Sequence, residues 1–209
     1  LDILLTGSRS GSSQSIIYRN NGTSFNTIPN KPIGLMSEII GNKIILKWNR
    51  ATDNKTAQNS LTYNLRIGKN PNEIDICTPM ANITNGFRRI PSMGNAQLDT
   101  FFVINTTYLS AGKYYWNVQT IDNAYAGSLF SVGDSFNIPL NSSAGLDKSI
   151  ICGGSTTLNV TTTNYNGSGT LSYSWNPNNG LNDPNIQNPT ASPFQTTTYY
   201  VTVTSSDGL

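Results

Sequence analysis

The acidic residues Glu73 and Asp75 have the spacing in this sequence that comes closest to a catalytic arrangement. Residues two positions apart lie on the same side of a β-strand, and a pair of carboxyl groups can hydrolyse a glycosidic bond. The segment "NEID" that holds them lies between strand-like runs, where a pair of acids is usually solvated. We therefore expect these carboxylates to carry no reaction.

The residues on which most enzymes depend are absent. The sequence has no His, which removes the most frequent general base and metal ligand. It also has no Cys-x-x-Cys, G-x-S-x-G or G-x-x-x-x-G-K motif. The net charge of +2 is too small for a nucleic-acid or anionic-membrane surface, and we expect the densest basic spot, Arg88 and Arg89, to be a solvated edge. We predict a chain without catalytic residues, metal ligands or cofactors of its own.

Aromatic side chains are the remaining candidates for binding, because an exposed ring can stack on a sugar. Trp48, Trp116 and Trp175 fall on inward positions of alternating patterns, so core packing is the better interpretation for all three. Tyr125, in the loop "DNAYAGS", is the candidate ligand contact. The alternative for Tyr125 is an exposed loop residue without a role.

The elements that must position these side chains are strands. Tyr114, Trp116 and Val118 alternate in "LSAGKYYWNVQTID", which predicts a strand with one buried face. Similar short runs recur between Asn, Gly, Pro and Ser clusters, whereas no helical apolar stripe is present, so an all-β fold is predicted. Breaks in composition at 28–32 and 138–145 divide the chain into segments 1–28, 29–139 and 140–209.

The middle segment contains "KIILKW", "LTYNLRIG", "TFFVIN", "LSAGKYYWNVQTID" and "SFNI" in that order. This order resembles a fibronectin type III domain. The resemblance implies a two-sheet sandwich in which the runs are strands B, C, E, F and G, with Trp48, Tyr114 and Trp116 in the core and Tyr114 at a strand corner. The connection from Asn70 to Leu98 is longer than that fold needs, and we expect an extra edge hairpin there.

The last segment contains "AGLDKSIICGGSTTLNV", "LSYSWNPNNGLNDPNIQNPTASP" and "TTTYYVTVTSSDG". It resembles the PKD-like or immunoglobulin-like repeats of large secreted bacterial proteins. The better-known PKD sequence has an acidic motif after its Trp that "SWNPNNG" lacks, so no calcium or ligand role is carried over. The resemblance implies a second sandwich whose inward residues are Leu158 and Val160, Tyr173 and Trp175, and Tyr199, Val201 and Val203.

The first segment contains "LDILLTG" and "YRNNGTSF". It resembles the end of an FG-GAP/VCBS repeat, the blade unit of integrin-type propellers, in which an acidic calcium loop precedes the first of these strands. Asp2 stands where the last acidic position of that loop would fall. A calcium site needs about six to eight oxygen ligands, so calcium is expected only in a propeller upstream. We expect the hairpin either to pack against the next domain or to be poorly ordered.

Cys77 and Cys152 lie in different predicted domains. A disulfide would require their Cα atoms to lie within about 7 Å of each other and would join the two domains. The favoured alternative is two unpaired thiols, or a Cys152 whose partner lies beyond the end of this sequence.

These patterns predict an all-β chain in which two tandem β-sandwiches follow a propeller-blade hairpin. We expect the chain to be part of a longer protein. Charged residues make up only 11% of the sequence, which we associate with extracellular bacterial modules. We expect a non-catalytic spacer and display region of a secreted or cell-surface adhesion-type protein whose partners are its neighbouring domains. The alternatives are a module that binds polysaccharide or matrix protein, and an accessory region of an extracellular hydrolase. No nucleic-acid partner and no membrane insertion are expected.

Overall fold

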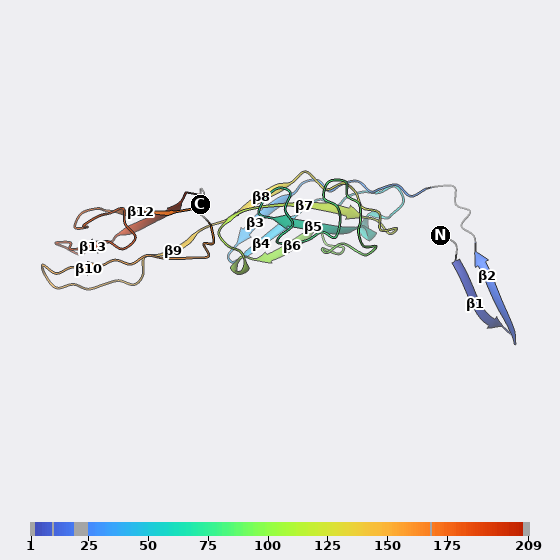
Figure 1. The fold of residues 1–209 in the computed structure, drawn as a ribbon, viewed down its shortest axis with the longest axis horizontal. Helices are drawn as coiled ribbons and strands as arrows, with labels where there is room; N and C mark the ends of the chain where they lie inside the picture. Colours follow the sequence, from blue (N-terminus) through green and yellow to red (C-terminus); the bar gives the residue numbers. More distant parts are fainter. Residues whose placement is uncertain (1–2, 10, 19–24, 168, 207–209) are drawn as a thin grey trace.

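The computed structural model describes residues 3–9, 11–18, 25–167 and 169–206. These ranges hold strands, turns and loops, together with two short 3-10 turns, η1 (Gln58–Ser60) and η2 (Thr106–Tyr108) (Figure 1). The predicted all-β class is therefore confirmed. The strands are β1 (Ile3–Arg9), β2 (Ser12–Tyr18), β3 (Met36–Ile40), β4 (Lys43–Lys47), β5 (Thr62–Gly68), β6 (Phe101–Asn105), β7 (Gly112–Ile121), β8 (Asp134–Ile138), β9 (Asn141–Ser143), β10 (Thr156–Thr157), β11 (Thr161–Thr163), β12 (Leu171–Asn176), β13 (Thr190–Ala191) and β14 (Tyr200–Ser205).

The central unit is a sandwich of two antiparallel sheets. One sheet has the strand order β3-β4-β6, and the other has the order β5-β7-β8. With the strands lettered along the chain, this is A-B-E on C-F-G, the arrangement shared by fibronectin type III and immunoglobulin-like sandwiches. The runs predicted as strands B, C, E, F and G all form strands of this unit.

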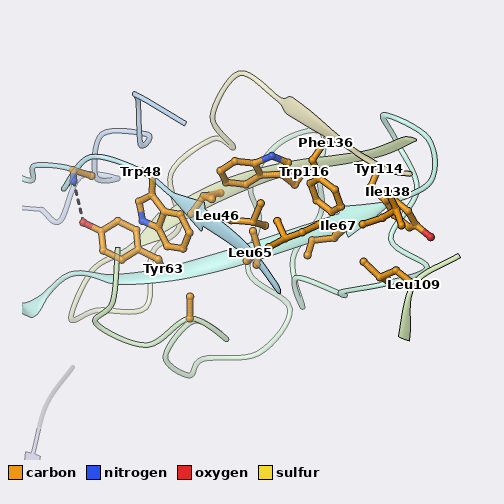
Figure 2. Packing of buried hydrophobic residues seen from close by; sticks show 14 of the residues in the cluster. Leu46, Trp48, Tyr63, Leu65, Ile67, Leu109, Tyr114, Trp116, Phe136 and Ile138 are labelled. Atoms are coloured by element: carbon orange, nitrogen blue, oxygen red, sulfur yellow. Dashed lines mark hydrogen bonds between the residues drawn. The ribbon is translucent and has the colours of Figure 1, made fainter. Parts of the chain in front are cut away.

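Aromatic side chains fill the core of the central unit. Trp48, Tyr114 and Trp116 are at most 4% exposed, and the ring centroids of Trp48 and Trp116 lie 6.3 Å apart (Figure 2). The Tyr114 ring stacks on Phe136 with centroids 5.4 Å apart. Its hydroxyl donates to the carbonyl oxygen of Ser110 at 3.0 Å and so ties the corner before β7. Because side chains alternate along a strand, the inward-facing residues of β4, β5 and β7 all point into the space between the two sheets.

The long connection between β5 and β6 covers the outer face of β5. All seven residues of β5 are buried, including the outward-facing Asn64 and Arg66. Arg66 donates to the carbonyl oxygens of Asn70, Pro71 and Glu73, and Asn64 donates to that of Pro79. In place of full strands, the connection has the isolated bridges Ile67–Cys77 and Ala81–Arg88. The second bridge closes a short turn in which the Asn82 N–H donates to Phe87 and the Arg89 N–H donates to Met80.

The C-terminal unit is built from three antiparallel strand pairs, β9–β11, β10–β13 and β12–β14. Its fully buried apolar side chains, among the residues described, are Val160, Trp175 and Ala191. The strand predicted through Leu158 and Val160 is broken between β10 and β11. The Leu158 N–H still donates to the backbone oxygen of Pro189, in register with β10 and β13, but Pro189 has no N–H with which to continue the ladder. The Val160 N–H donates to the side chain of Asn188 in place of a strand partner.

The N-terminal hairpin pairs β1 with β2 and buries none of its large apolar side chains. Ile3, Leu4 and Leu5 of β1 are 54–61% exposed, and the facing residues of β2 are equally open. Of the two alternatives expected for this hairpin, packing against the next domain is therefore not observed for the described residues. Asp2, the expected last position of a calcium loop, lies outside the described residues.

The two larger units meet at a short junction, which we define as Ser110, Ala111, residues 139–141, Asn164 and Asn166. Only Pro139 and Leu140 separate β8 from β9. The side chain of Asn164 donates to the Pro139 carbonyl oxygen and accepts from the Asn141 N–H, both at 3.1 Å. Its backbone oxygen accepts from the Ala111 N–H at 2.7 Å. Asn166 donates to the Ser110 hydroxyl at 2.9 Å.

Candidate functional site

A hollow of about 530 Å³ lies where the β7–β8 loop meets the long β5–β6 connection, within the size range of small-molecule sites. It contains Tyr125, the residue predicted as a ligand contact, and Arg88 from the predicted basic pair. We call it the Tyr125 hollow. Its lining residues are Ile28, Asn85, Gly86, Phe87, Arg88, Pro91, Ala124, Tyr125, Ala126 and Gly127.

Asp122 at the end of β7 sets the position of Tyr125. Its carboxylate is buried and accepts the N–H groups of Ala124 and Ala126 at 2.9 and 2.8 Å, while its other oxygen accepts from the Asn26 amide at 2.6 Å. This tight turn holds Tyr125 at a φ of 62°, a left-handed conformation that is uncommon for a residue other than Gly. The loop thus holds the Tyr125 ring, which is 43% exposed, at the wall of the hollow.

Gln119 fastens the two loops to each other beneath the hollow. Its side chain is fully buried and donates to the carbonyl oxygens of Gly86 at 2.5 Å and Ser128 at 2.7 Å, and it accepts from the Asn64 amide at 3.0 Å. Gly86 has a φ of 73°, and a Cβ atom there would lie 2.2 Å from the Ser128 oxygen. The close approach of the two loops therefore requires Gly at position 86.

Arg88 is a structural residue of the connection. Its guanidinium donates to the carbonyl oxygens of Pro79, Ile90 and Ser92 at 2.8–3.3 Å. Burial lowers the pKa of this guanidinium. In the described part of the chain Arg88 makes no ion pair, and its Nε is buried without a hydrogen-bond partner. The expectation that Arg88 is a solvated edge is wrong, because its charged end turns into the loop it holds.

Two exposed aromatic rings dominate the chemistry of the hollow. Phe87 is 70% exposed and Tyr125 is 43% exposed, and Ile28 contributes a third open apolar surface. Aromatic and apolar surfaces of this kind bind by stacking and desolvation. The lining residues include no His, Cys, Asp or Glu. The hollow is therefore suited to binding rather than to acid–base or nucleophilic chemistry.

The sequence analysis singled out Tyr125, assigned Arg88 to a solvated edge, and missed Phe87, Ile28 and Gln119. Phe87 directly precedes the basic pair Arg88 and Arg89, and a large apolar side chain at that position is a signal in the sequence. Gln119 occupies an outward position of a strand, where a polar residue is ordinarily solvated. The connection that buries Gln119 follows β5 in sequence. The residues of β7 alone therefore do not predict this burial.

The other predicted residues lie away from the hollow. Trp48, Tyr114, Trp116 and Trp175 are in the interiors of their units, with exposures of 0–4%. The Glu73 and Asp75 side chains are exposed; the Asp75 carboxylate accepts the Lys69 N–H, and the Glu73 backbone oxygen accepts from Arg66.

Both cysteines of the chain lie within the described residues. Cys77 and Cys152 are free thiols, and burial raises the pKa of Cys77. No group of three or more His, Cys, Asp or Glu side chains is arranged to hold a metal ion within residues 3–9, 11–18, 25–167 and 169–206. In the same ranges, no helix is long and apolar enough to cross a membrane.

Comparison with known proteins gives only distant similarity. No protein-family model matches the chain, and no curated protein matches it. The spore cortex lytic enzyme SleM of Clostridium perfringens is 17% identical over 63% of this chain and 36% of that chain, with a TM-score of 0.36. The central fibronectin-III array of RIM-binding protein is 13% identical over 86% and 63% of the two chains, with a TM-score of 0.31. The FN1–FN3 domains of chicken CNTN1 are 10% identical over 94% and 66%, with a TM-score of 0.34. The chain thus spans between about a third and two thirds of these structures, and TM-scores this low carry no inference about its function.

Proposed function

We propose that this chain is a non-catalytic spacer and display region of a large secreted or cell-surface bacterial protein of the adhesion type. The observation that carries the proposal is the junction. The chain passes from β8 to β9 through two residues. The side chain of Asn164 forms hydrogen bonds with the Pro139 carbonyl oxygen and with the Asn141 N–H, at the two ends of this linker.

The junction couples the linker to both units. Asn164 follows β11 of the C-terminal unit, and its backbone oxygen accepts from Ala111 at the corner before β7. At the same corner, the backbone oxygen of Ser110 accepts from the Tyr114 hydroxyl, and the Ser110 hydroxyl accepts from the Asn166 amide. A two-residue linker tied in this way holds the two units end to end (Figure 1). A rod of this kind sets the distance between whatever modules are attached at its ends.

In this proposal the C-terminal unit is a PKD-like or immunoglobulin-like module, and the N-terminal hairpin belongs to an FG-GAP/VCBS repeat. The pairing of β12 with β14 supports the first assignment, because it corresponds to the C–F strand pair of such sandwiches. The second rests on the sequence pattern alone. The low content of charged residues, 11%, supports an extracellular location.

Small-angle X-ray scattering tests the spacer role. We expect the natural chain to give the narrow, elongated distance distribution of two units held in line. Asn164→Gly combined with Asn166→Ala should broaden that distribution, because Gly keeps the positive φ of 58° but loses both side-chain bonds to the linker. Asn179→Ala, which removes an exposed amide outside the junction, is the matched control. A distribution as broad in the natural chain as in the double variant would contradict a spacer.

A second candidate function is binding of polysaccharide or matrix protein at the Tyr125 hollow. Two exposed aromatic rings beside a ligand-sized hollow favour it. Pull-down on insoluble polysaccharides and matrix proteins, with and without calcium, is the direct test. Saturable retention that Tyr125→Ala or Phe87→Ala removes, and that Tyr108→Ala leaves intact, would support binding, since Tyr108 is 86% exposed and lies outside the hollow. If no matrix retains the chain, the spacer role remains as the single proposed function.

A further inference from the structure

The sequence contains a pair of residues that can modify itself, an Asn followed directly by a Gly. The Gly nitrogen gives up its proton to solvent and bonds to the side-chain carbonyl carbon of the Asn, whose amide nitrogen takes up a proton and leaves as ammonia. Water then opens the resulting succinimide ring to Asp or to isoaspartate. The pair occurs four times, and three of its copies lie within the described residues: Asn85–Gly86, Asn166–Gly167 and Asn179–Gly180.

Hydrogen bonds decide which of these pairs is free to react. The Gly N–H must lose its proton and the Asn amide must turn toward the Gly nitrogen, so a bond to either group has to open first. At the first pair both groups are held. The Asn85 Oδ1 accepts from the Phe87 N–H at 2.9 Å. The N–H of Gly86, which is buried, donates to the Asn82 carbonyl oxygen at 2.8 Å, so this pair is protected twice.

The pair at Asn179 is open on both counts. Asn179 and Gly180 are exposed, and within the described residues neither the Asn179 side chain nor the Gly180 N–H has a hydrogen-bond partner. Gly180 has a φ of 78°, so the turn requires Gly, the residue that shields its own nitrogen least. Asn166 lies between the two cases, because its amide donates to the Ser110 hydroxyl at 2.9 Å.

We propose that Asn179 is a self-modification site of this protein, which deamidates in the folded chain faster than Asn85 or Asn166 does. Tyr199 supports the reaction. Its hydroxyl donates at 2.6 Å to the Asn179 carbonyl oxygen, which belongs to the same peptide group as the Gly180 N–H. This bond draws electron density from the peptide group and makes its N–H proton easier to lose. Burial raises the pKa of Tyr199, so its hydroxyl remains protonated and acts as a donor at neutral pH.

The turn that changes is tied to the rest of the C-terminal unit. The Gly180 carbonyl oxygen accepts from the Ser192 N–H at 2.7 Å. Leu181 forms a bridge to Ala191, one of the buried residues of this unit. Isoaspartate routes the chain through one additional carbon atom and turns the carbonyl group that Tyr199 binds into a carboxylate. These ties cannot all keep their geometry, so we expect deamidation to weaken the C-terminal unit and to leave the central sandwich unchanged.

Peptide mapping by mass spectrometry tests the site. The full chain is incubated at mildly alkaline pH, both folded and in concentrated urea. In the folded chain Asn179 should deamidate about fivefold faster than Asn166, where one bond must open, and about five- to thirtyfold faster than Asn85, where two must open. In urea these bonds are lost and the three rates should be similar. Equal rates in the folded chain, a faster Asn85 or Asn166, or the same ranking in urea would overturn the proposal.

A Tyr199→Phe variant tests the supporting role of the phenol. It should slow deamidation at Asn179 and leave the rate at Asn85 unchanged. A hydroxyl that merely held the turn in place would have the opposite effect, because its loss would loosen the turn and speed the reaction. A faster Asn179 in this variant would therefore overturn the role of Tyr199.

Ageing of two further variants tests the consequence for stability. Asn179→Gln keeps a neutral amide but reacts much more slowly, because the longer side chain must close a larger ring. The aged natural chain should lose amide-exchange protection in β12 and β14 and keep it in β5 and β7, whereas aged Asn179→Gln should keep both. Asn85→Gln is the matched control and should age as the natural chain does. An equal loss of protection in aged Asn179→Gln would overturn the assignment of this weakening to Asn179.

Discussion

At the scale of single residues, the loops around the Tyr125 hollow depend on a buried amide. Replacing Gln119 by Leu would leave the carbonyl oxygens of Gly86 and Ser128 without their donor. An unsatisfied buried acceptor costs about 1–3 kcal/mol, so we expect Gln119→Leu to lower the free energy of unfolding of the central unit by about 2–4 kcal/mol. Urea unfolding followed by tryptophan fluorescence measures this difference. A loss below about 0.5 kcal/mol, the size of an ordinary surface substitution, would mean that the two loops hold together without Gln119.

Two buried phenols should make stability depend on alkaline pH. Burial raises the pKa of Tyr63 and of Tyr114 above the ordinary value of 10.0. The unfolded chain therefore releases these protons at a lower pH than the folded chain does. Their contribution is complete below about pH 10 and is lost as the pH rises through the folded pKa values.

The corresponding measurement is the urea midpoint between about pH 9 and pH 11. We expect it to fall with pH in the natural chain and to fall less in the double variant Tyr63→Phe, Tyr114→Phe. Equal slopes for the two proteins would show that other groups carry the alkaline transition.

The sequence predicts inward-facing residues well and buried outward-facing residues poorly. Alternation alone places Trp48, Trp116 and Trp175 on inward faces, because the period of a strand is a local property. Tyr125 could be predicted as a loop residue for the same reason. Asn64 and Gln119 stand at positions that alternation assigns to solvent, and only the fold of the distant β5–β6 connection buries them.

At the scale of elements, the C-terminal unit depends on a single large side chain. Trp175 is 4% exposed, and its indole N–H donates to the Ile186 carbonyl oxygen at 3.0 Å. The other fully buried apolar residues described in this unit, Val160 and Ala191, are small. We expect Trp175→Ala to cost about 3–5 kcal/mol and to unfold this unit while the central sandwich stays folded.

Amide hydrogen exchange separates the two units in the Trp175→Ala variant. Exchange should become fast throughout β12 and β14 and stay slow in β5 and β7. Loss of protection in both units would show that they fold as one body.

Strand positions were predictable where a strand pairs along its whole length, and less so where side chains compete for the backbone. The runs in β5, β7 and β12 match their observed strands closely, since apolar alternation and strand pairing agree there. Between β10 and β11 the pattern of Leu158 and Val160 is that of a strand, but Pro189 opposite Leu158 has no N–H to continue the ladder, and the Asn188 side chain accepts the Val160 N–H. That competition involves residues about thirty positions away, which no local pattern reveals.

At the scale of the whole molecule, the two units share a junction but no core. The central unit has a large buried cluster to which β4, β5, β7 and β8 contribute, and no described residue of the C-terminal unit belongs to that cluster. Among the described residues, the hydrogen bonds across the junction centre on Asn164 and Asn166. A handful of hydrogen bonds, each contributing on the order of 1 kcal/mol, can fix an orientation without making two units unfold together.

Calorimetry should therefore show two transitions, with the C-terminal unit melting first because it buries far less apolar surface. A fragment spanning 29–139 should keep the upper transition at nearly its original temperature. A single transition whose calorimetric and van't Hoff enthalpies agree would mean that the units are one cooperative body. Two transitions together with a narrow solution shape would show that the junction supplies alignment rather than shared stability.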